Sequence, residues 1–302
     1  MSRLTDLPRT LLLAAALAAC GGDAGNAAPA AAVRATDANG QAVELARPAA
    51  RVISLVPSGT DLLVAAGGRE RLVARTDNDH APELAALPSV GGMEPSLERI
   101  VALRPELVVV FQASASRALL EGLRAQGIPV FALGTRDTAE TFAGLAALGR
   151  LAGVERGAEA LGGRMRAELA AVSAAAPADT PSVFLLVNAD PPMTAGPGTF
   201  MAQLVAAAGG RTAFPELRED WAMISLEEVL RRQPAWLVTS AGDGGTRERR
   251  LAQLRAAPGW RELRAVREGR VVVLPSDLIS RPGPRMGEAA RALRDALHPP
   301  SR

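Results

Sequence analysis

At residues 96–110 the chain reads Ser-Leu-Glu-Arg-Ile-Val-Ala-Leu-Arg-Pro-Glu-Leu-Val-Val-Val, and this stretch decides the fold. A polar cap residue opens an apolar helix with an acid in its first turn. The helix ends before Pro105, and a buried strand follows. Residues 225–238 repeat the pattern as Ser-Leu-Glu-Glu-Val-Leu-Arg-Arg-Gln-Pro-Ala-Trp-Leu-Val. A duplicated helix–strand unit predicts two similar α/β lobes with a cleft between them.

The repeat also places an acid at the equivalent position of each lobe, Glu98 and Glu227. The helix dipole favours an acid in the first turn, where the side chain is expected to stay exposed. Glu228 is a rival to Glu227, because Ser225 and Glu228 have the spacing of a capping box. Capping would engage Glu228 locally and leave Glu227 free. The simpler alternative is that both acids only stabilise their helices.

The bulk composition favours a globular protein that does not bind nucleic acid. The chain has 302 residues, of which 48% are hydrophobic, enough for one large domain or two ordinary ones. Its formal net charge is only +2, and acids and arginines are interspersed along the sequence. No basic block is present to contact phosphates.

The N-terminus has the features of an export signal. Two arginines precede the apolar run 11–19, which ends at Cys20. The run is too short to cross a bilayer, which takes about 20 residues, but has the length of a signal-peptide core. The sequence Leu-Ala-Ala-Cys at 17–20 resembles a lipobox, in which the cysteine is lipidated. The alternatives are an ordinary secretory signal or a buried N-terminal helix.

We therefore expect residues 1–19 to be a signal peptide and residues 20–32 a lipidated cysteine with a flexible Gly/Ala/Pro tether. Cys20 is the only cysteine, which excludes an internal disulfide. The mature protein is expected in the periplasm, anchored to a membrane, or on the outer surface of a cell that has a single membrane.

The rest of the chain alternates strands and helices, which predicts an α/β fold. We assign residues 33–137 to an N-terminal α/β lobe, 138–177 to a long linking helix and 178–302 to a C-terminal α/β lobe. In the first lobe, Pro-Ser-Gly at 57–59 is expected to end a strand, with a helix only from Asp61. A further strand is expected at 72–74. Glycines within the linking segment also allow an interrupted helix.

Catalytic signals are weak. The chain has two histidines and one cysteine, lacks Gly-x-Ser-x-Gly, and has no glycine pattern with Walker spacing. We expect neither an enzyme nor a resident cofactor or metal. A binding protein suits this inventory better.

Four stretches resemble the periplasmic cobalamin-binding proteins of ABC importers, a family that also carries iron siderophores and haem. They are Arg-Val-Ile-Ser-Leu-Val-Pro-Ser-Gly-Thr-Asp-Leu-Leu at 51–63, Leu-Glu-Arg-Ile-Val-Ala-Leu-Arg-Pro-Glu-Leu-Val at 97–108, Pro-Pro-Met-Thr-Ala-Gly at 191–196 and Ser-Arg-Pro-Gly-Pro-Arg at 280–285. The resemblance covers nearly all of 33–297. It implies two α/β lobes with central sheets flanked by helices, joined by a rigid helix. It also implies that Glu98 and Glu227 dock onto arginines of the permease.

For the ligand, loops at the strand ends of the two lobes are expected to face each other. The candidate side chains are Pro57, Ser58, Asp79, His80, Met93, Phe111, Met193, Trp221, Asp277 and Arg281. The resemblance matches Phe111 and Trp221 to aromatic contacts with a corrin, Asp277 to a polar contact, and Met193 to a position usually aromatic. Core packing is the alternative for the aromatics. His80 is either close to the ligand metal or simply a loop side chain.

The resemblance implies transport of cobalamin or a related corrinoid by a monomer that works with an ABC permease and its ATPase. Haem carriers of this family typically ligate iron through tyrosine, and this chain has none. A ferric siderophore is the alternative cargo, because Arg75, Arg136 and Arg281 would suit an anionic chelate. From a different class, the alternative is a surface lipoprotein enzyme or sensor.

Overall fold

The computed structural model describes residues 32–112, 116–242 and 245–300, and residues 31–302 form one compact unit. The expected signal peptide and Cys20 lie outside the described residues, as does the tether except for its last residue. None of the described helices has both the length and the apolar character needed to cross a bilayer.

The N-terminal lobe is built on a three-stranded parallel sheet in the order β3-β4-β5. The strands are β3 (Val52–Ser54), β4 (Leu107–Phe111) and β5 (Val130–Leu133). Their residues are buried on both faces, because one apolar cluster covers each side of the sheet. The flanking elements are the hairpin β1 (Val33–Thr36) and β2 (Ala42–Leu45) and the helices α1 (Pro57–Ala65), α2 (Leu97–Ala102), α3 (Arg117–Ala125) and α4 (Thr138–Ala152), with short 3-10 turns η1 (Arg69–Arg71) and η2 (Pro82–Leu84).

Helix α1 begins four residues earlier than the sequence predicts. Pro57 is its first residue, and Ser58 and Thr60 are buried within its first turn. Proline is well suited to this position because its fixed φ is helical and the missing N–H has no partner there in any case. The predicted strand at 72–74 was wrong, since only an isolated bridge joins Leu72 to Val52.

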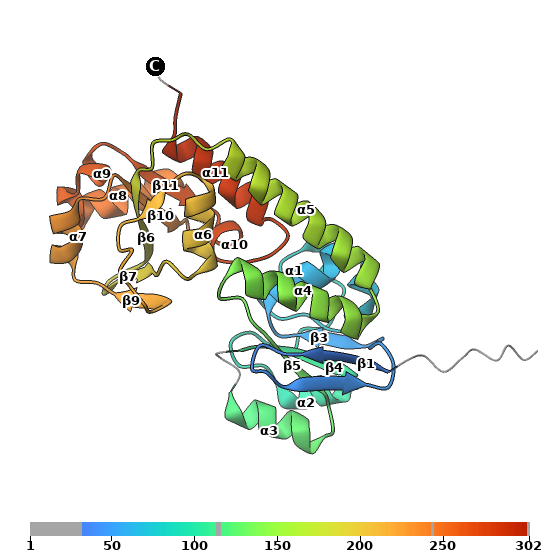
Figure 1. The fold of residues 1–302 in the computed structure, drawn as a ribbon. Coiled ribbons are helices and arrows are strands. Elements are labelled where there is room, and N and C mark those ends of the chain that lie inside the picture. Colours follow the sequence, from blue (N-terminus) through green and yellow to red (C-terminus); the bar gives the residue numbers. More distant parts are fainter. Residues whose placement is uncertain (1–31, 113–115, 243–244, 301–302) are drawn as a thin grey trace, which may run out of the picture. The chain divides into compact units, whose positions relative to one another are not determined.

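The segment 138–177, predicted as one linking helix with a possible interruption, is two helices, α4 and α5 (Glu155–Ala174), which meet at Gly153. Gly153 has φ 68°, the left-handed conformation that ends a helix and favours glycine. Asp137 caps α4, because its Oδ1 accepts the N–H of Glu140 at 2.8 Å. Helix α5 is about 30 Å long at 1.5 Å per residue. It contacts α1 and α4 on one side and α6 and α11 on the other (Figure 1).

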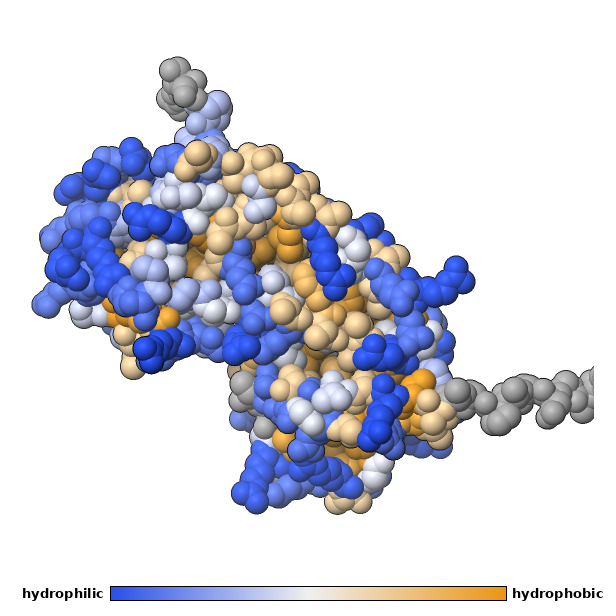
Figure 2. Space-filling model, in the orientation of Figure 1, coloured by the Kyte–Doolittle hydropathy of each residue, from blue (hydrophilic) through white to orange (hydrophobic). Residues whose placement is uncertain are grey.

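The C-terminal lobe has a six-stranded mixed sheet in the order β11-β10-β6-β7-β9, with β8 (Arg211–Thr212) also paired to β6. The strands β6 (Ser182–Ala189), β10 (Trp236–Ser240) and β11 (Val271–Leu274) are parallel, while β7 (Pro192–Ala195) and β9 (Trp221–Met223) are antiparallel. Its helices are α6 (Phe200–Ala207), α7 (Leu226–Arg232), α8 (Arg247–Ala256), α9 (Arg264–Arg267), α10 (Ser276–Ile279) and α11 (Met286–Leu297), with a 3-10 turn η3 (Trp260–Glu262). Hydrophilic residues dominate the surface over α7, α8 and α9 (Figure 2).

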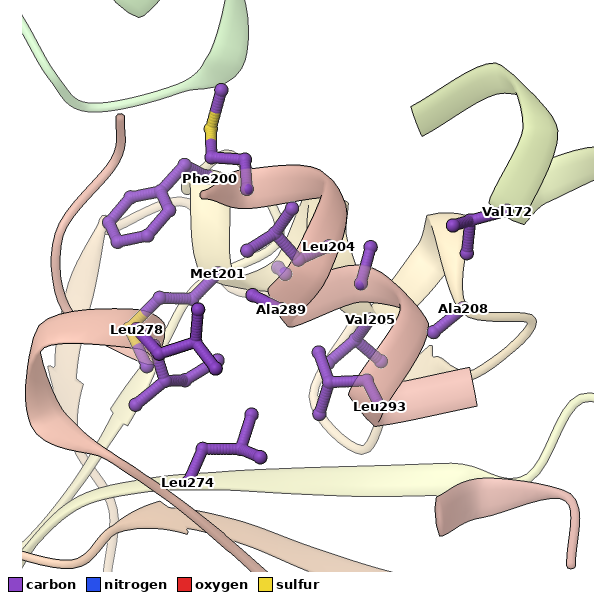
Figure 3. Packing of buried hydrophobic residues seen from close by; sticks show 14 of the residues in the cluster. Val172, Phe200, Met201, Leu204, Val205, Ala208, Leu274, Leu278, Ala289 and Leu293 are labelled. Atoms are coloured by element: carbon purple, nitrogen blue, oxygen red, sulfur yellow. The ribbon is translucent and has the colours of Figure 1, made fainter. Parts of the chain in front are cut away.

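One hydrophobic core runs through both lobes. It includes Leu62 of α1, Leu145 of α4 and Met165 of α5, and continues into α6 and α11 of the C-terminal lobe. In Figure 3, Leu204 and Val205 of α6 lie against Ala289 and Leu293 of α11. Burying one such side chain stabilises the fold by about 1.5–3 kcal/mol, so a large rotation of one lobe against the other is costly.

Candidate functional site

A cavity of about 770 Å³ lies between the two lobes, and we call it the inter-lobe cavity. Its walls come from the β1–β2 turn, the start of α1, the end of β4, and from β6, α6, β9 and the α10–α11 loop. Ligands of open α/β sheets bind beyond the carboxyl ends of parallel strands, where β4 and β10 end here. The lining residues are Asn39, Val56, Pro57, Ser58, Phe111, Gln112, Thr135, Arg136, Glu140, Leu186, Val187, Phe200, Met201, Asp220, Trp221, Ser240, Ser280, Arg281 and Pro282.

Each lobe contributes an aromatic side chain to the cavity wall. Phe111 ends β4 and is half-buried, whereas Trp221 starts β9 and is 48% exposed. Trp221 therefore does not belong to the core, unlike Trp260, which is only 4% exposed. Exposure of an indole ring to water is unfavourable, and a bound ligand can cover this apolar surface.

The charged residues that line the cavity balance one another. They are two arginines, Arg136 and Arg281, and two acids, Glu140 and Asp220. Nη2 of Arg136 lies 3.1 Å from Oε1 of Glu140 and 3.4 Å from Oδ2 of Asp137, so its charge is already compensated. Such a wall offers hydrogen bonds but no net charge to attract a polyanion.

Of the ten side chains predicted to bind a ligand, the structure places five in this wall: Pro57, Ser58, Phe111, Trp221 and Arg281. The other five lie elsewhere. Oδ2 of Asp79 is buried and accepts bonds from N and Oγ1 of Thr76, both at 2.7 Å, so this carboxylate organises its own loop. His80 is exposed and lines two neighbouring cavities.

The remaining three side chains, Met93, Met193 and Asp277, lie in parts of the structure outside the cavity wall. Met93 is 93% exposed and lies in the loop that precedes α2. This loop is closed by a hydrogen bond of 2.8 Å from Ser96 N to Val90 O. Met193 lies on β7 in register with Met223. Asp277 accepts a bond from Nη1 of Arg285 at 3.0 Å.

Several cavity residues were missed by the sequence reasoning. Asn39 reaches the cavity because the β1–β2 turn folds over the end of β5, where Ala38 N donates to Ala132 O at 2.9 Å. Gln112 directly follows Phe111, and this adjacency was the one available signal. No periodicity distinguishes the others, which are Val56, Thr135, Glu140, Leu186, Val187, Phe200, Met201, Asp220, Ser240, Ser280 and Pro282. Arg136 was proposed only for an anionic ligand, and its companion Arg75 does not line this cavity.

The two repeated helices have the predicted caps. Oγ of Ser96 accepts the N–H of Arg99 at 3.3 Å in α2, and Oγ of Ser225 accepts the N–H of Glu228 at 3.2 Å in α7. Glu98 and Glu227 are both exposed. Within the described residues neither has a cationic partner within 4 Å.

Glu228 differs from Glu227 because arginines engage it. Its carboxylate accepts bonds from Nε of Arg231 at 2.7 Å and Nε of Arg232 at 2.8 Å. Hydrogen bonds from Arg231 and then Arg232 lower the pKa of Glu228 to about 2. Glu228 is engaged within its own helix, but the predicted capping was wrong, since arginines and not the backbone of Ser225 bind its carboxylate in the described residues.

The described residues contain no group of three or more His, Cys, Asp or Glu side chains arranged to hold a metal ion. The sole histidine near the lobe junction, His80, is outside the inter-lobe cavity wall.

Comparison with known proteins identifies the family to which this chain belongs. Residues 52–278 match the family model described as periplasmic binding protein. The vitamin B12-binding protein of Salmonella typhimurium is 32% identical over 256 residues, which cover 82% of this chain and 90% of the relative. YvrC of Bacillus subtilis, an uncharacterized ABC transporter substrate-binding lipoprotein, is 28% identical over 272 residues, 87% of this chain and 84% of the relative.

Among solved structures, the periplasmic haem-binding protein RhuT from Roseiflexus in its apo form has a TM-score of 0.71 at 26% identity. The match covers 82% of this chain and 99% of RhuT. The relatives are binding proteins by name, and their two-lobed architecture is the one described above. With a family match across most of the chain, and a cavity between lobes joined by a helix, the chain belongs to the periplasmic binding protein family.

Proposed function

We propose that this protein is the substrate-binding component of an ABC importer and captures a corrinoid such as vitamin B12 in the inter-lobe cavity. The observation that carries this proposal is the pair of aromatic side chains, Phe111 and Trp221, one from each lobe. Two aromatic surfaces facing a cavity suit a ligand with a large flat ring. The similarity to vitamin B12-binding proteins over most of the chain supports the same cargo.

The charge balance of the cavity supports a ligand without a high net charge. Cobalamin carries many neutral carboxamides around its ring, and these match hydrogen-bonding side chains such as Gln112, Ser240 and Arg281. A carboxylate-rich ferric siderophore, or haem with its two propionates, would favour unpaired arginines, yet Arg136 is paired with Glu140. Cobalamin therefore fits this wall better than either anionic chelate.

The protein is a carrier in this proposal, held to a membrane through lipid on Cys20 and recognised by the permease through Glu98 and Glu227. Exposed carboxylates that have no cationic partner in the described part of the chain are available to a basic partner, which favours fast and oriented docking. Since the shared core opposes large lobe rotation, the permease has to supply the energy that opens the cavity.

The test is calorimetric titration of the purified protein with cyanocobalamin, with haem and a ferric hydroxamate siderophore in parallel. We expect saturable one-to-one binding of cyanocobalamin and much weaker heat from the other two. Saturable binding of the siderophore or haem without binding of cyanocobalamin would contradict the proposed cargo.

A further inference from the structure

Arg281 occupies an unusual position at the junction of the two lobes. It follows α10 in the C-terminal lobe, and its side chain is 25% exposed. It lines the inter-lobe cavity and also two neighbouring cavities of about 430 and 600 Å³. Its side chain therefore forms part of the partition between the ligand cavity and the space behind it.

The guanidinium of Arg281 reaches across to the N-terminal lobe. Nη2 donates a hydrogen bond to the carbonyl oxygen of Asn78 at 2.8 Å. Nη1 lies 4.0 Å from Oδ2 of Asp61 in α1. Both partners are in the N-terminal lobe, so one side chain connects the lobes through a hydrogen bond and a charge attraction.

The loop that presents Asn78 is held in place by its own hydrogen bonds. Oδ2 of Asp79 accepts bonds from N and Oγ1 of Thr76, and Oγ1 of Thr76 accepts the N–H of Asn78 at 3.2 Å. Oδ1 of Asp79 is buried without a hydrogen-bond partner in the described part of the chain. The carbonyl of Asn78 is consequently a preorganised acceptor next to the buried carboxyl group of Asp79.

The electrostatic surroundings of Asp61 show how much this contact depends on Arg281. Burial raises the pKa of the Asp61 carboxyl, and the Arg281 guanidinium is the largest opposing influence. Asp79 and Asp277 raise the pKa further, and Arg285 lowers it. Without Arg281, only Arg285 would oppose the influence of burial, Asp79 and Asp277 on the Asp61 carboxyl.

We propose that Arg281 couples ligand capture to the contact between the lobes. Its guanidinium connects the lobes through Asn78 and Asp61, and an oxygen acceptor on the bound ligand takes over part of that guanidinium. The acceptor is a carboxamide or phosphate oxygen, the groups that a guanidinium binds at the edge of a large ligand. This step rests on the proposed use of the inter-lobe cavity as the ligand site.

The competition has a defined consequence. The five N–H donors of a guanidinium are fixed in one planar fork. When the fork turns toward the ligand, all five move together, which weakens the contacts with Asn78 and Asp61. Coupling is reciprocal, so weakening the contact with Asp61 must favour the ligand by the same amount. Arg281→Gln and Asp61→Asn are therefore expected to change ligand affinity in opposite directions.

The first measurement concerns the lobes alone and needs no ligand. Spin labels at Arg124→Cys in α3 and Arg249→Cys in α8, in the full chain with Cys20→Ser, report the distance between the lobes by pulsed EPR. We expect both R281Q and D61N to broaden the distance distribution. The matched control is R294Q, because Arg294 pairs with Asp295 within α11 and its side chain is as exposed as that of Arg281. Unchanged distributions in both test variants would overturn the proposal.

The second measurement is cyanocobalamin affinity by calorimetry. We expect R281Q to bind roughly tenfold more weakly, because a charge-assisted hydrogen bond is lost, and D61N to bind severalfold more tightly. Equal weakening in both variants would indicate a merely structural role and contradict the coupling. A third outcome is that the wild type binds no cyanocobalamin while the inter-lobe distance distributions of R281Q and D61N still broaden. The contact between the lobes would then be supported, but the proposed cargo and the coupling of Arg281 to a corrinoid would both be refuted.

Discussion

Gly157 of α5 lies directly against the carbonyl oxygen of Ala66 at the end of α1, so closely that no side chain fits between them. A Cβ at residue 157 would overlap this backbone oxygen, which cannot move aside as a side-chain end can. This contact brings the linking helix onto the N-terminal lobe and allows a single core to extend across both lobes.

Gly157→Ala is expected to destabilise the protein by about 1–3 kcal/mol, the usual cost of inserting an atom into a packed core. Urea unfolding followed by circular dichroism measures this. The control is Gly163→Ala in the same helix, where a Cβ meets nothing within 4 Å. That change should stabilise the protein by about 0.5–1 kcal/mol through helix propensity. Equal effects of the two changes would refute the close contact.

Trp221→Ala is expected to lower cyanocobalamin affinity roughly 10- to 100-fold, since an aromatic anchor in a pocket carries much of the binding energy. Because Trp221 is 48% exposed, the melting temperature should hardly change. Trp260→Ala is the contrasting change: Trp260 is 4% exposed and packs against Phe184, so about 3–5 kcal/mol of stability is lost. Calorimetry and thermal melts separate the two effects. Undiminished affinity in Trp221→Ala would remove this ring from the site.

The double change Glu98→Ala and Glu227→Ala is expected to abolish transport while leaving ligand affinity as it was, because both acids are outside the inter-lobe cavity. Uptake by cells measures transport, and calorimetry on the purified variant measures ligand affinity. Glu228→Ala is the matched control, since its carboxylate is already engaged by arginines. Loss of uptake in the control but not in the double variant would contradict docking through Glu98 and Glu227 and would point to Glu228 instead.

The arginine pairs of Glu228 predict a pH dependence. The folded-state pKa of Glu228 is lowered to about 2, below its value in the unfolded chain. Ionised Glu228 therefore contributes stability above the unfolded pKa, about 4.3, and this contribution is lost as the pH falls toward 2. Urea unfolding at pH 6 and pH 3 should show a smaller loss for Glu228→Gln than for the wild type. Identical pH dependence in the two proteins would show that these bonds add no stability.

Much of the fold follows from local patterns. The Ser-Leu-Glu repeats, with their caps and proline stops, correctly predicted α2, β4, α7 and β10. The sequence predictions were wrong where one local pattern is compatible with two structures. Pro57 ends a strand and also begins a helix, and a β-branched run such as 72–74 becomes a strand only if a neighbour offers enough partners.

The candidate site was predictable in part. Phe111, Ser58 and Trp221 were found because they follow or precede regular elements at the cleft edge of each lobe. Phe200 and Val187 were missed, because an apolar residue in a helix or strand has the same sequence signal whether it faces a core or a cavity. Arg281 was predicted as a ligand residue, yet its contact with Asn78, 203 positions away, is invisible in sequence.

The sequence by itself determined the two-lobed α/β organisation and the paired acids, because helix caps, strand runs and proline stops act over a few residues. The tertiary structure alone decided which side chains share the inter-lobe cavity and that Arg281 joins the lobes. These outcomes depend on contacts between residues far apart in the chain, whose geometry arises only when the two lobes pack on α5.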